Sequence, residues 1–358
     1  MSTLPESSSL PATSDAPESF AAPAPLTAEQ QRHYDALRAG VTWFTHPGRW
    51  SRIHGPKATD ALNGLVTNDV SLLAEGTSQY AAALTPKGKM VADMTIVRAD
   101  ADTFFISVDA TAVEGWLGLA RKYINPRLAR TTDESALWVT CAIYGQQLQT
   151  ALQSIGVADP DASGAARIGD TDVRVVQAPT LSGVQGVWVM VPADRFEAIR
   201  ERIVGACGPE ADVSVAELLR IEGGRPTMFI DMDENTIPQE ANLDALEAIS
   251  FTKGCYTGQE TVARVHFRGH VNKHLRGLSS TVPLVRGTQL VDDAGKVIGD
   301  VRSTAVSPRL GAIAIGMVRR EIAPGTSVHA RLLTTVDGGS VPRETLAPVR
   351  VEALPFSG

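Results

Sequence analysis

Hydrophobic and polar residues follow two different periods over residues 27–205. Apolar residues that recur every three to four positions predict helices, and strict alternation between turn signals predicts strands. The helical period occurs over residues 27–37, 56–65, 112–123, 147–155 and 194–204. The alternating period occurs over residues 80–84, 90–98 and 103–108, and residues 42–55 are predicted as a loop followed by a strand. The mixture predicts an α+β fold in which helices cover antiparallel sheets.

The pattern changes near residue 271, where short β-rich runs separated by turn signals begin. Such runs are typical of a small β-barrel. Residues 1–25 are rich in Ser, Pro and Ala and have few large apolar side chains, which predicts a disordered tail. We therefore predict an α+β region of two subdomains over residues 26–270 and a C-terminal barrel domain over residues 271–358.

Composition excludes several classes of protein. A chain of 358 residues is long enough for two or three domains, and it has no apolar run of the roughly 18 to 20 residues that a membrane helix needs. The formal net charge of −7 argues against a protein whose main role is binding nucleic acid. The N-terminus lacks the pattern of a secretory signal, so we expect a cytoplasmic protein without a membrane span.

The three cysteines are widely separated and odd in number, which favours a reducing compartment over a disulfide framework. Cys141 lies in an alternating apolar run and Cys207 follows a short apolar stretch, so both are predicted to be buried and structural. Cys255 differs from these two, because polar and charged residues that can take part in a reaction flank it.

Residues 251–260, with the sequence FTKGCYTGQE, bring a cysteine, a lysine, two glycines and an amide–acid pair together. Lys253 stands two residues before Cys255, so in an extended segment both side chains point to one face and the ammonium favours the thiolate. The alternative is a glycine-rich turn that holds a buried, inert thiol. The local pattern leaves both interpretations open.

The end of the same segment carries a helix-start signal. Thr257 and Glu260 have the spacing of a capping box, which predicts a helix that starts at Gly258 and leaves Cys255 just before its positive end. Gly254 and Gly258 are predicted to lie where the backbone turns tightly or lets a partner come close.

This segment also carries a family resemblance. KGCYTGQE, followed by TVARVHFRG, resembles the signature of the YgfZ-type proteins, which are folate-binding relatives of the aminomethyltransferase (T protein) of the glycine cleavage system. Residues 64–97, 217–246 and 295–320 are similar, in the same order, to the superfamily's first folate-binding segment, its central segment and its terminal barrel. The resemblance implies two interleaved α+β folate-binding subdomains and a C-terminal barrel around a central cavity.

Asp93 lies where the aminomethyltransferases carry a pair of acids, of which one is catalytic, and Ala92 replaces the first of that pair. An acid between apolar neighbours in a strand either faces solvent or is aimed at a polar ligand, because an unpaired buried carboxylate is costly. The resemblance favours the second reading, with Asp93 facing the pterin.

Arg220 and Glu222 match the family's central segment. An arginine fork suits a carboxylate such as the glutamate tail of folate, so we expect Arg220 and Glu222 to help hold the cofactor. An internal pair between Arg220 and a glutamate would produce the same residues. Glu240 is predicted either to cap the helix that follows or to turn inward.

One departure from the family affects the expected chemistry. The aminomethyltransferases use a tyrosine and a glutamate to hold the pterin, and the matching stretch here, residues 181–192, places Trp188 at the position of the glutamate. Together with Ala92, this loss argues against transfer of an aminomethyl group and fits the YgfZ branch.

A basic run follows the cysteine segment and consists of Arg264, His266, Arg268, His270, Lys273, His274 and Arg276. It is predicted to be a solvated face or a surface that meets an anionic partner or a polyglutamate tail. Three of its histidines are spaced by four residues, but Gly269 and the missing acidic or cysteine partners argue against a metal site, and we expect none.

The resemblance implies a tetrahydrofolate-binding accessory factor that supports iron–sulfur cluster assembly or repair in particular enzymes, among them radical enzymes that methylthiolate tRNA. Cys255 would be the reactive group and Lys253 would keep it ionised. Support from the rest of the motif would come from Gly254, Tyr256, Gly258, Gln259 and Glu260. The expected partners are folate and iron–sulfur client enzymes or assembly proteins, with no direct nucleic acid contact.

Two other functions compete with this one. The first is a folate-dependent transferase of aminomethyl or methyl groups, with Asp93 as the catalytic acid–base group and Cys255 incidental. The second is a folate-binding module without chemistry, in which neither residue matters.

Overall fold

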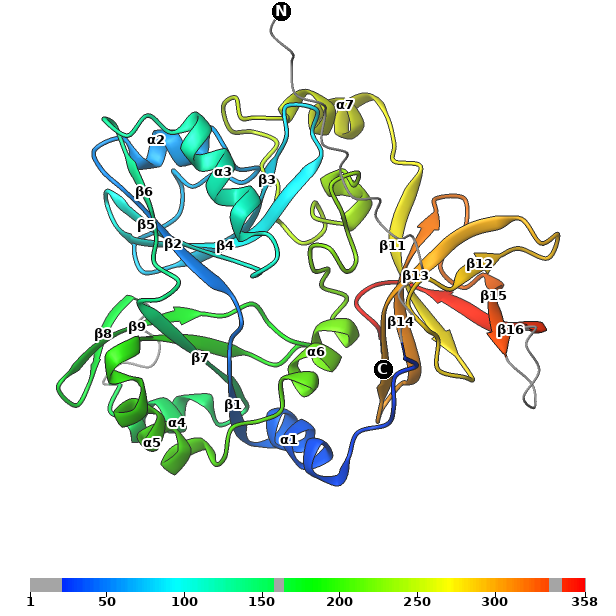
Figure 1. Ribbon diagram of the computed structural model, residues 1–358, viewed down its shortest axis with the longest axis horizontal. Coiled ribbons are helices and arrows are strands. Elements are labelled where there is room, and N and C mark those ends of the chain that lie inside the picture. Colours follow the sequence, from blue (N-terminus) through cyan, green and yellow to red (C-terminus); the bar gives the residue numbers. More distant parts are fainter. Residues whose placement is uncertain (1–20, 158–163, 335–342, 358) are drawn as a thin grey trace, which may run out of the picture.

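The structure is a computed structural model that describes residues 21–157, 164–334 and 343–357 (Figure 1). Within these residues the strands form two five-stranded antiparallel sheets and one closed six-stranded barrel. The helices are α1 (Ala28–Ala39), α2 (Ala58–Asn63), α3 (Val113–Tyr123), α4 (Leu148–Ile155), α5 (Phe196–Cys207), α6 (Val213–Glu222) and α7 (Gln259–Arg268), with short 3₁₀ turns η1 (Ala193–Arg195) and η2 (Pro238–Ala241).

The first sheet takes its strands from the early part of the chain. In spatial order they are β3 (Ser78–Leu84), β4 (Met90–Asp100), β5 (Thr103–Val108), β2 (Arg49–His54) and β6 (Arg130–Asp133). Helix α3 packs on β4 and β6, and α2 packs on β2. Buried side chains such as Trp50, Phe104 and Trp116 fill the core between the sheet and these helices.

The second sheet interleaves with the first along the chain. In spatial order its strands are β1 (Val41–Thr45), β7 (Trp138–Gly145), β10 (Gly186–Pro192), β9 (Thr171–Gln177) and β8 (Gly164–Ile168). Strands β1 and β2 are consecutive in sequence but belong to different sheets, so the chain crosses between the subdomains. Helices α4 and α5 cover this sheet, with Cys141 and Cys207 in the core between them. The prediction that both cysteines are buried is confirmed.

The C-terminal strands close into a barrel. Around the barrel they are β11 (Lys273–Ser280), β14 (Gly311–Arg319), β13 (Val297–Ser307), β12 (Gln289–Val291), β15 (Ser327–Thr334) and β16 (Arg343–Glu352). Helix α6 packs on β13 and β14 and so lies between the second sheet and the barrel (Figure 1). The predicted α+β fold with a C-terminal barrel is confirmed, and the domain boundary predicted at residue 271 falls just before β11.

Most predicted elements match observed ones within three residues at each end, and one segment was wrong. Residues 42–55 were expected to be a loop followed by a strand, but two strands, β1 and β2, occupy this stretch. Strand β1 exists because Val41–Thr45 pairs with β7, about a hundred residues later, and local periodicity does not report such a partner. Most of the tail predicted over residues 1–25 lies outside the described residues.

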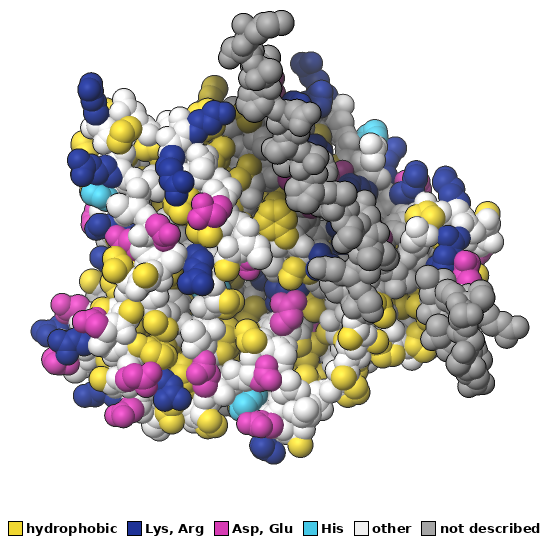
Figure 2. Space-filling model, in the orientation of Figure 1, with side chains coloured by type: hydrophobic (Ala, Val, Ile, Leu, Met, Phe, Trp, Pro, Cys, Tyr) yellow, Lys and Arg dark blue, Asp and Glu magenta, His cyan; other side chains and the backbone are white. Residues whose placement is uncertain are grey.

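None of the helices in the described part of the chain is both long and apolar enough to cross a bilayer. On the face shown in Figure 2, acidic and basic side chains are interspersed among neutral and hydrophobic ones.

Candidate functional site

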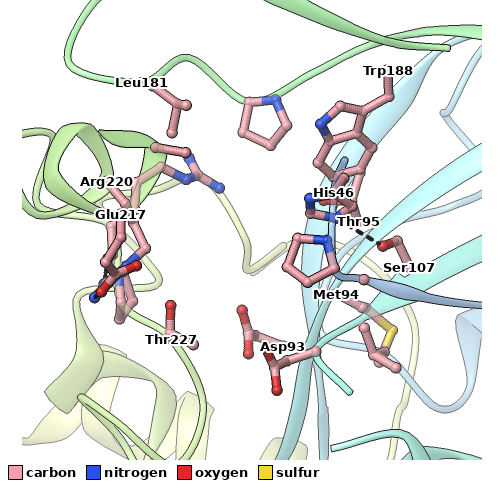
Figure 3. Close-up of a pocket in the computed structure, with 18 of the residues that line it drawn as sticks. His46, Asp93, Met94, Thr95, Ser107, Leu181, Trp188, Glu217, Arg220 and Thr227 are labelled. Carbon is pink, nitrogen blue, oxygen red and sulfur yellow. Dashed lines mark hydrogen bonds and ion pairs between the residues drawn. The ribbon is translucent and has the colours of Figure 1, made fainter. Parts of the chain in front are cut away.

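A pocket of about 290 Å³ opens between the two sheets and α6. The connection between β1 and β2 contributes His46, strands β3 and β4 contribute Tyr80 and Asp93, and β10 contributes Trp188. Figure 3 shows that Asp93, His46 and Trp188 face Glu217 and Arg220 of α6 across the pocket. The volume is close to the lower end of the roughly 300 to 1,000 Å³ typical of small-molecule sites.

Asp93 is one of three carboxylates among the described residues that line this pocket, with Asp109 and Glu217. Its Oδ2 accepts a hydrogen bond of 2.8 Å from the Tyr80 hydroxyl. Its Oδ1 is buried and has no hydrogen-bond partner among the described residues. Burial is the main cause that raises the pKa of Asp93, and the nearby charge of Asp109 raises it further. Asp93 therefore lines the pocket with one oxygen left to accept from a ligand.

Aromatic side chains form the wall beside Asp93. The indole of Trp188 stacks on the ring of His46, with centroids 4.3 Å apart, and meets Trp50 edge to face. Burial lowers the pKa of His46 to about 4, and the Asp109 carboxylate opposes this shift. The imidazole is therefore neutral at pH 7. Trp188 lines the pocket with an apolar surface at the position where the resemblance placed a glutamate.

Arg220 lines the pocket, but its guanidinium is fully engaged inside the protein. Nε and Nη2 bind the carboxylate of Glu217 at 2.8 and 2.5 Å, and Nη1 binds Asp231 at 2.7 Å. The two remaining N–H groups are donated to the Ser303 hydroxyl, at 2.6 Å, and to the main-chain oxygen of Arg225. The internal pairing considered as the alternative is thus present, and a folate carboxylate could bind Arg220 only by breaking one of these bonds.

Glu222 is not among the residues that line the pocket. Its side chain is completely buried, where Oε1 accepts hydrogen bonds from Tyr34 and Ser307 at 2.9 and 2.6 Å. Its Oε2 accepts from Ser182 at 3.1 Å and pairs with the guanidinium of Arg38 at 3.5 Å. Glu222 therefore joins α1 and α6 to the end of β13, and the structure places it in a structural role instead of the expected contact with the cofactor.

The cysteine segment lies apart from the pocket lining, at the start of α7. Cys255 is exposed, whereas Lys253 is buried and its ammonium donates to the main-chain oxygens of Asn63, Val66 and Asn68 at 2.7 to 2.8 Å. Burial lowers the pKa of Lys253 to about 8, against the opposing charge of Asp69. The expectation that Lys253 holds the thiol ionised is therefore corrected, because its ammonium is committed to three carbonyls while the thiol lies at the surface.

Helix α7 begins where the spacing predicted, but the capping box was wrong. The N-cap is Gly258, at φ +84°, and no side chain caps the first turn. The Thr257 hydroxyl donates instead to the main-chain oxygen of Gly64. Gly258 is required because an added Cβ would lie 2.6 Å from the carbonyl oxygen of Thr85 in the β3–β4 turn.

The other motif residues divide between core and surface. Tyr256 is buried, and its ring lies 5.1 Å from the Lys253 ammonium. Gln259 is half-buried, whereas Gly254 and Glu260 are exposed. The exposed residues of this segment therefore surround Cys255, and the buried ones anchor it to residues 63–68.

A chain of hydrogen bonds links this loop to the pocket. The Lys253 ammonium binds the oxygen of Asn68, and the Asn68 amide donates 2.9 Å to the main-chain oxygen of Tyr80. The Tyr80 hydroxyl in turn binds Asp93. The cysteine segment and the pocket are thus separate in position but share the β3–β4 hairpin.

Glu240 has a structural position, whereas the first four residues of the basic run are exposed and the last three are half-buried, which agrees with the predicted solvated face. The Glu240 carboxylate accepts from the main-chain nitrogen of Ile237, so it caps its own 3₁₀ turn. In the basic run, His266 stacks on Phe251 with ring centroids 3.6 Å apart, and His274 lies on β11 with Nδ1 3.3 Å from the amide oxygen of Asn242. The described ranges contain no cluster of three or more metal-ligating side chains.

Sequence reasoning missed His46, Tyr80 and Arg225. They come from three separate segments, and only Tyr80 lies in a predicted strand. The one local signal was the His-Pro-Gly turn between β1 and β2, which places a titratable ring next to a chain reversal.

Comparison with known proteins gives consistent relationships. Residues 13–253 match the family model described as the GCVT N-terminal domain. An aminomethyltransferase from Rubrobacter xylanophilus is 29% identical over 325 residues, which cover 89% of this chain and 83% of the relative. The tRNA-modifying protein YgfZ from Klebsiella pneumoniae is 31% identical over 241 residues (65% of this chain, 69% of the relative), and that from Shigella sonnei is 33% identical over 246 residues (64% and 70%).

The fold has a solved counterpart as well. The crystal structure of glycine cleavage system aminomethyltransferase T from Bartonella henselae superposes with a TM-score of 0.80 at 21% identity, covering 92% of this chain and 89% of that one. At this identity the match concerns the fold alone.

Proposed function

The chain belongs to the family of the GCVT N-terminal domain, and on this premise we propose that it is a tetrahydrofolate-binding accessory factor for iron–sulfur cluster assembly or repair. Its clients would be specific enzymes, including those that methylthiolate tRNA. Cys255 is the reactive group, and the pocket that contains Asp93 binds the folate. The observation that carries the proposal is the contrast among the three cysteines, since the two others are buried and Cys255 is exposed in the motif.

The pocket chemistry fits a reduced pterin. Its pyrimidine ring is planar and the molecule carries N–H donors, and the pocket offers the flat indole of Trp188 together with the unpartnered Oδ1 of Asp93. A buried acceptor without a partner is costly unless a ligand donates to it. Bound tetrahydrofolate would supply a one-carbon carrier, and the residues of this chain would orient the ring and accept its N–H groups.

Lys253 acts as a positioning residue in this proposal. By tying the loop to residues 63–68 it fixes the backbone on which Cys255 is displayed, and through Asn68 it connects that loop to Tyr80. Gly254, Gln259 and Glu260 form the surface around the thiol that a client protein would meet.

The test is complementation of a bacterial strain that lacks its own YgfZ-type protein, with methylthiolated tRNA measured by mass spectrometry. We expect rescue by the wild type and loss of rescue in Cys255→Ala. Thr252→Ala, an exposed change in the same loop, is the matched control and should rescue fully. Equal rescue by Cys255→Ala would remove the thiol from the mechanism, and no rescue by well-expressed wild type would refute the maturation role.

Asp93 supports a second candidate, a folate-dependent one-carbon transferase. A carboxyl with a raised pKa and a free oxygen in a pocket is suited to general acid–base chemistry. This function predicts turnover of an N-methyl or aminomethyl donor with tetrahydrofolate, and loss of that turnover in Asp93→Asn while folate still binds. Absence of turnover with any such donor would exclude it.

A further inference from the structure

Two arginines line the pocket, and the structure separates them by what their guanidinium groups bind. Arg220 matches the family's central segment and was the expected cofactor contact. Its five N–H groups have five partners inside the protein, so none remains for a ligand. Its two carboxylate partners, Glu217 and Asp231, also neutralise its charge within the pocket wall.

Arg225, five residues later, differs because its guanidinium is not occupied by acceptors from the described part of the protein. Its guanidinium lies over the ring of Tyr80, 4.8 Å from the centroid, and its side chain has no hydrogen-bond acceptor among the described residues. The side chain is half-buried, so part of its hydration has been lost without replacement. A cation in this state is a ready partner for an oxygen acceptor that enters the pocket.

The surroundings of Arg225 define where that acceptor would lie. The charge of Arg225 acts on Asp93, Tyr80 and Tyr144, and in each case it opposes the rise in pKa that burial causes. The Tyr80 ring therefore has the Arg225 cation on its face and the Asp93 carboxylate at its hydroxyl. The pocket therefore presents a donor, Arg225, and an acceptor, Asp93, both held against the same side chain, Tyr80.

The backbone around Arg225 is held in place by Arg220. The Nη1 of Arg220 donates to the main-chain oxygen of Arg225, and the main-chain nitrogen of Arg225 donates 3.1 Å to the oxygen of Arg220. Arg220 thus acts as a positioning residue whose loss affects the fold, whereas the side chain of Arg225 is free to serve the ligand.

We propose that Arg225 is the residue that binds an oxygen acceptor of the pocket ligand, a carbonyl or carboxylate oxygen, in place of Arg220. The inference rests on the proposed function, in which the ligand is tetrahydrofolate. Two groups of that molecule have this chemistry, namely the 4-oxo oxygen of the pterin and the carboxylates of the glutamyl tail. Guanidinium donates to either in a planar, two-pronged geometry that an ammonium cannot reproduce.

The test measures affinity and stability separately. Tetrahydrofolate binding is titrated by calorimetry under anaerobic conditions for wild type, Arg225→Met, Arg225→Lys and Arg220→Met, and the melting temperature is recorded without ligand. Arg225→Met should weaken binding by about 10- to 100-fold, as expected for a lost hydrogen bond to a charged group, and leave the melting temperature nearly unchanged. Arg225→Lys should fall between the two, and Arg220→Met should lower the melting temperature clearly.

A second ligand distinguishes the two oxygen sources. If Arg225→Met loses the same factor with 6-methyltetrahydropterin as with tetrahydrofolate, the pterin oxygen is the acceptor. If it loses affinity for tetrahydrofolate alone, the acceptor is a tail carboxylate. Arg320→Met, an exposed arginine on the barrel, is the matched control and should bind like wild type.

Failure of this inference differs from failure of the proposed function. Wild-type affinity in both Arg225 variants, with wild type binding tetrahydrofolate, would overturn the role of Arg225 alone. A wild type that binds neither ligand would overturn folate binding and the role of Arg225 with it.

Discussion

Replacing Glu222 with glutamine tests whether this buried acid is a structural joint or a ligand contact. In the structure it receives hydroxyl hydrogen bonds from α1, from the 179–185 loop and from the end of β13, and it pairs with two arginines at 3.5 Å. An amide keeps the shape of the side chain but turns one acceptor into a donor. At least one buried hydroxyl then faces an N–H group instead of an oxygen.

The magnitude follows from these contacts. A buried polar group left without a partner costs about 1 to 3 kcal/mol, and one or two hydroxyls lose their acceptor in Glu222→Gln. The two arginines remain about 30% exposed, so water takes over most of their lost pairing. We expect a loss of about 2 to 4 kcal/mol in the free energy of unfolding, or about 1 M in the urea midpoint for a slope of about 3 kcal/mol/M.

The assay is urea unfolding followed by tryptophan fluorescence, together with tetrahydrofolate binding. Glu321→Gln is the matched control, because Glu321 pairs with Arg319 at 3.9 Å across side chains that are half exposed, and its loss should not move the midpoint. An unchanged urea midpoint in Glu222→Gln would refute the structural role of this side chain. Weaker folate binding with unchanged stability would instead indicate that Glu222 contacts the ligand.

Three further predictions concern the pocket and the loop. Because the pKa of His46 is lowered to about 4, this residue should contribute a rise of about 3 kcal/mol to stability between pH 4 and 6.5. The urea midpoints of wild type and His46→Gln should therefore diverge over this range, and parallel curves would contradict the prediction. Lys253→Met should speed amide hydrogen exchange across residues 63–68, because three carbonyls there lose their donor. The control Lys87→Met, at an exposed lysine, should not change this exchange. Equal protection in both variants would show that Lys253 does not hold this segment in place. Gly258→Ala should cost about 1 to 3 kcal/mol by calorimetry, since a side chain there is strained and meets a carbonyl oxygen; wild-type stability would show that the turn can adjust.

The elements that sequence predicted well are those whose burial pattern is local. Helix α3 was predicted over residues 112–123 and spans Val113–Tyr123, because its apolar side chains face one sheet at helical spacing. Strand β1 was missed because its partner, β7, comes from a distant segment. Helix α6 was not predicted, because it packs against both α1 and the barrel and so has less contrast between its faces.

For the site, sequence located the segments but not their contacts. The cysteine motif and Asp93 were both identified, and Asp93 does face the pocket. His46 and Tyr80 were missed, because each becomes part of a site only when the two sheets come together around α6.

The sequence by itself determined the helix and strand periods, the barrel, the family resemblance and the candidate reactive groups, because these depend on residue type and short-range spacing. Only the tertiary structure decided which groups meet. Lys253 and Cys255 are two residues apart, yet one ammonium is buried among carbonyls and one thiol is exposed. Arg220 and Arg225 are equally basic, yet Glu217 of the same helix, Asp231 and the distant Ser303 occupy the first. The second keeps only the ring of Tyr80, so the availability of each side chain depends on which groups the fold brings to it.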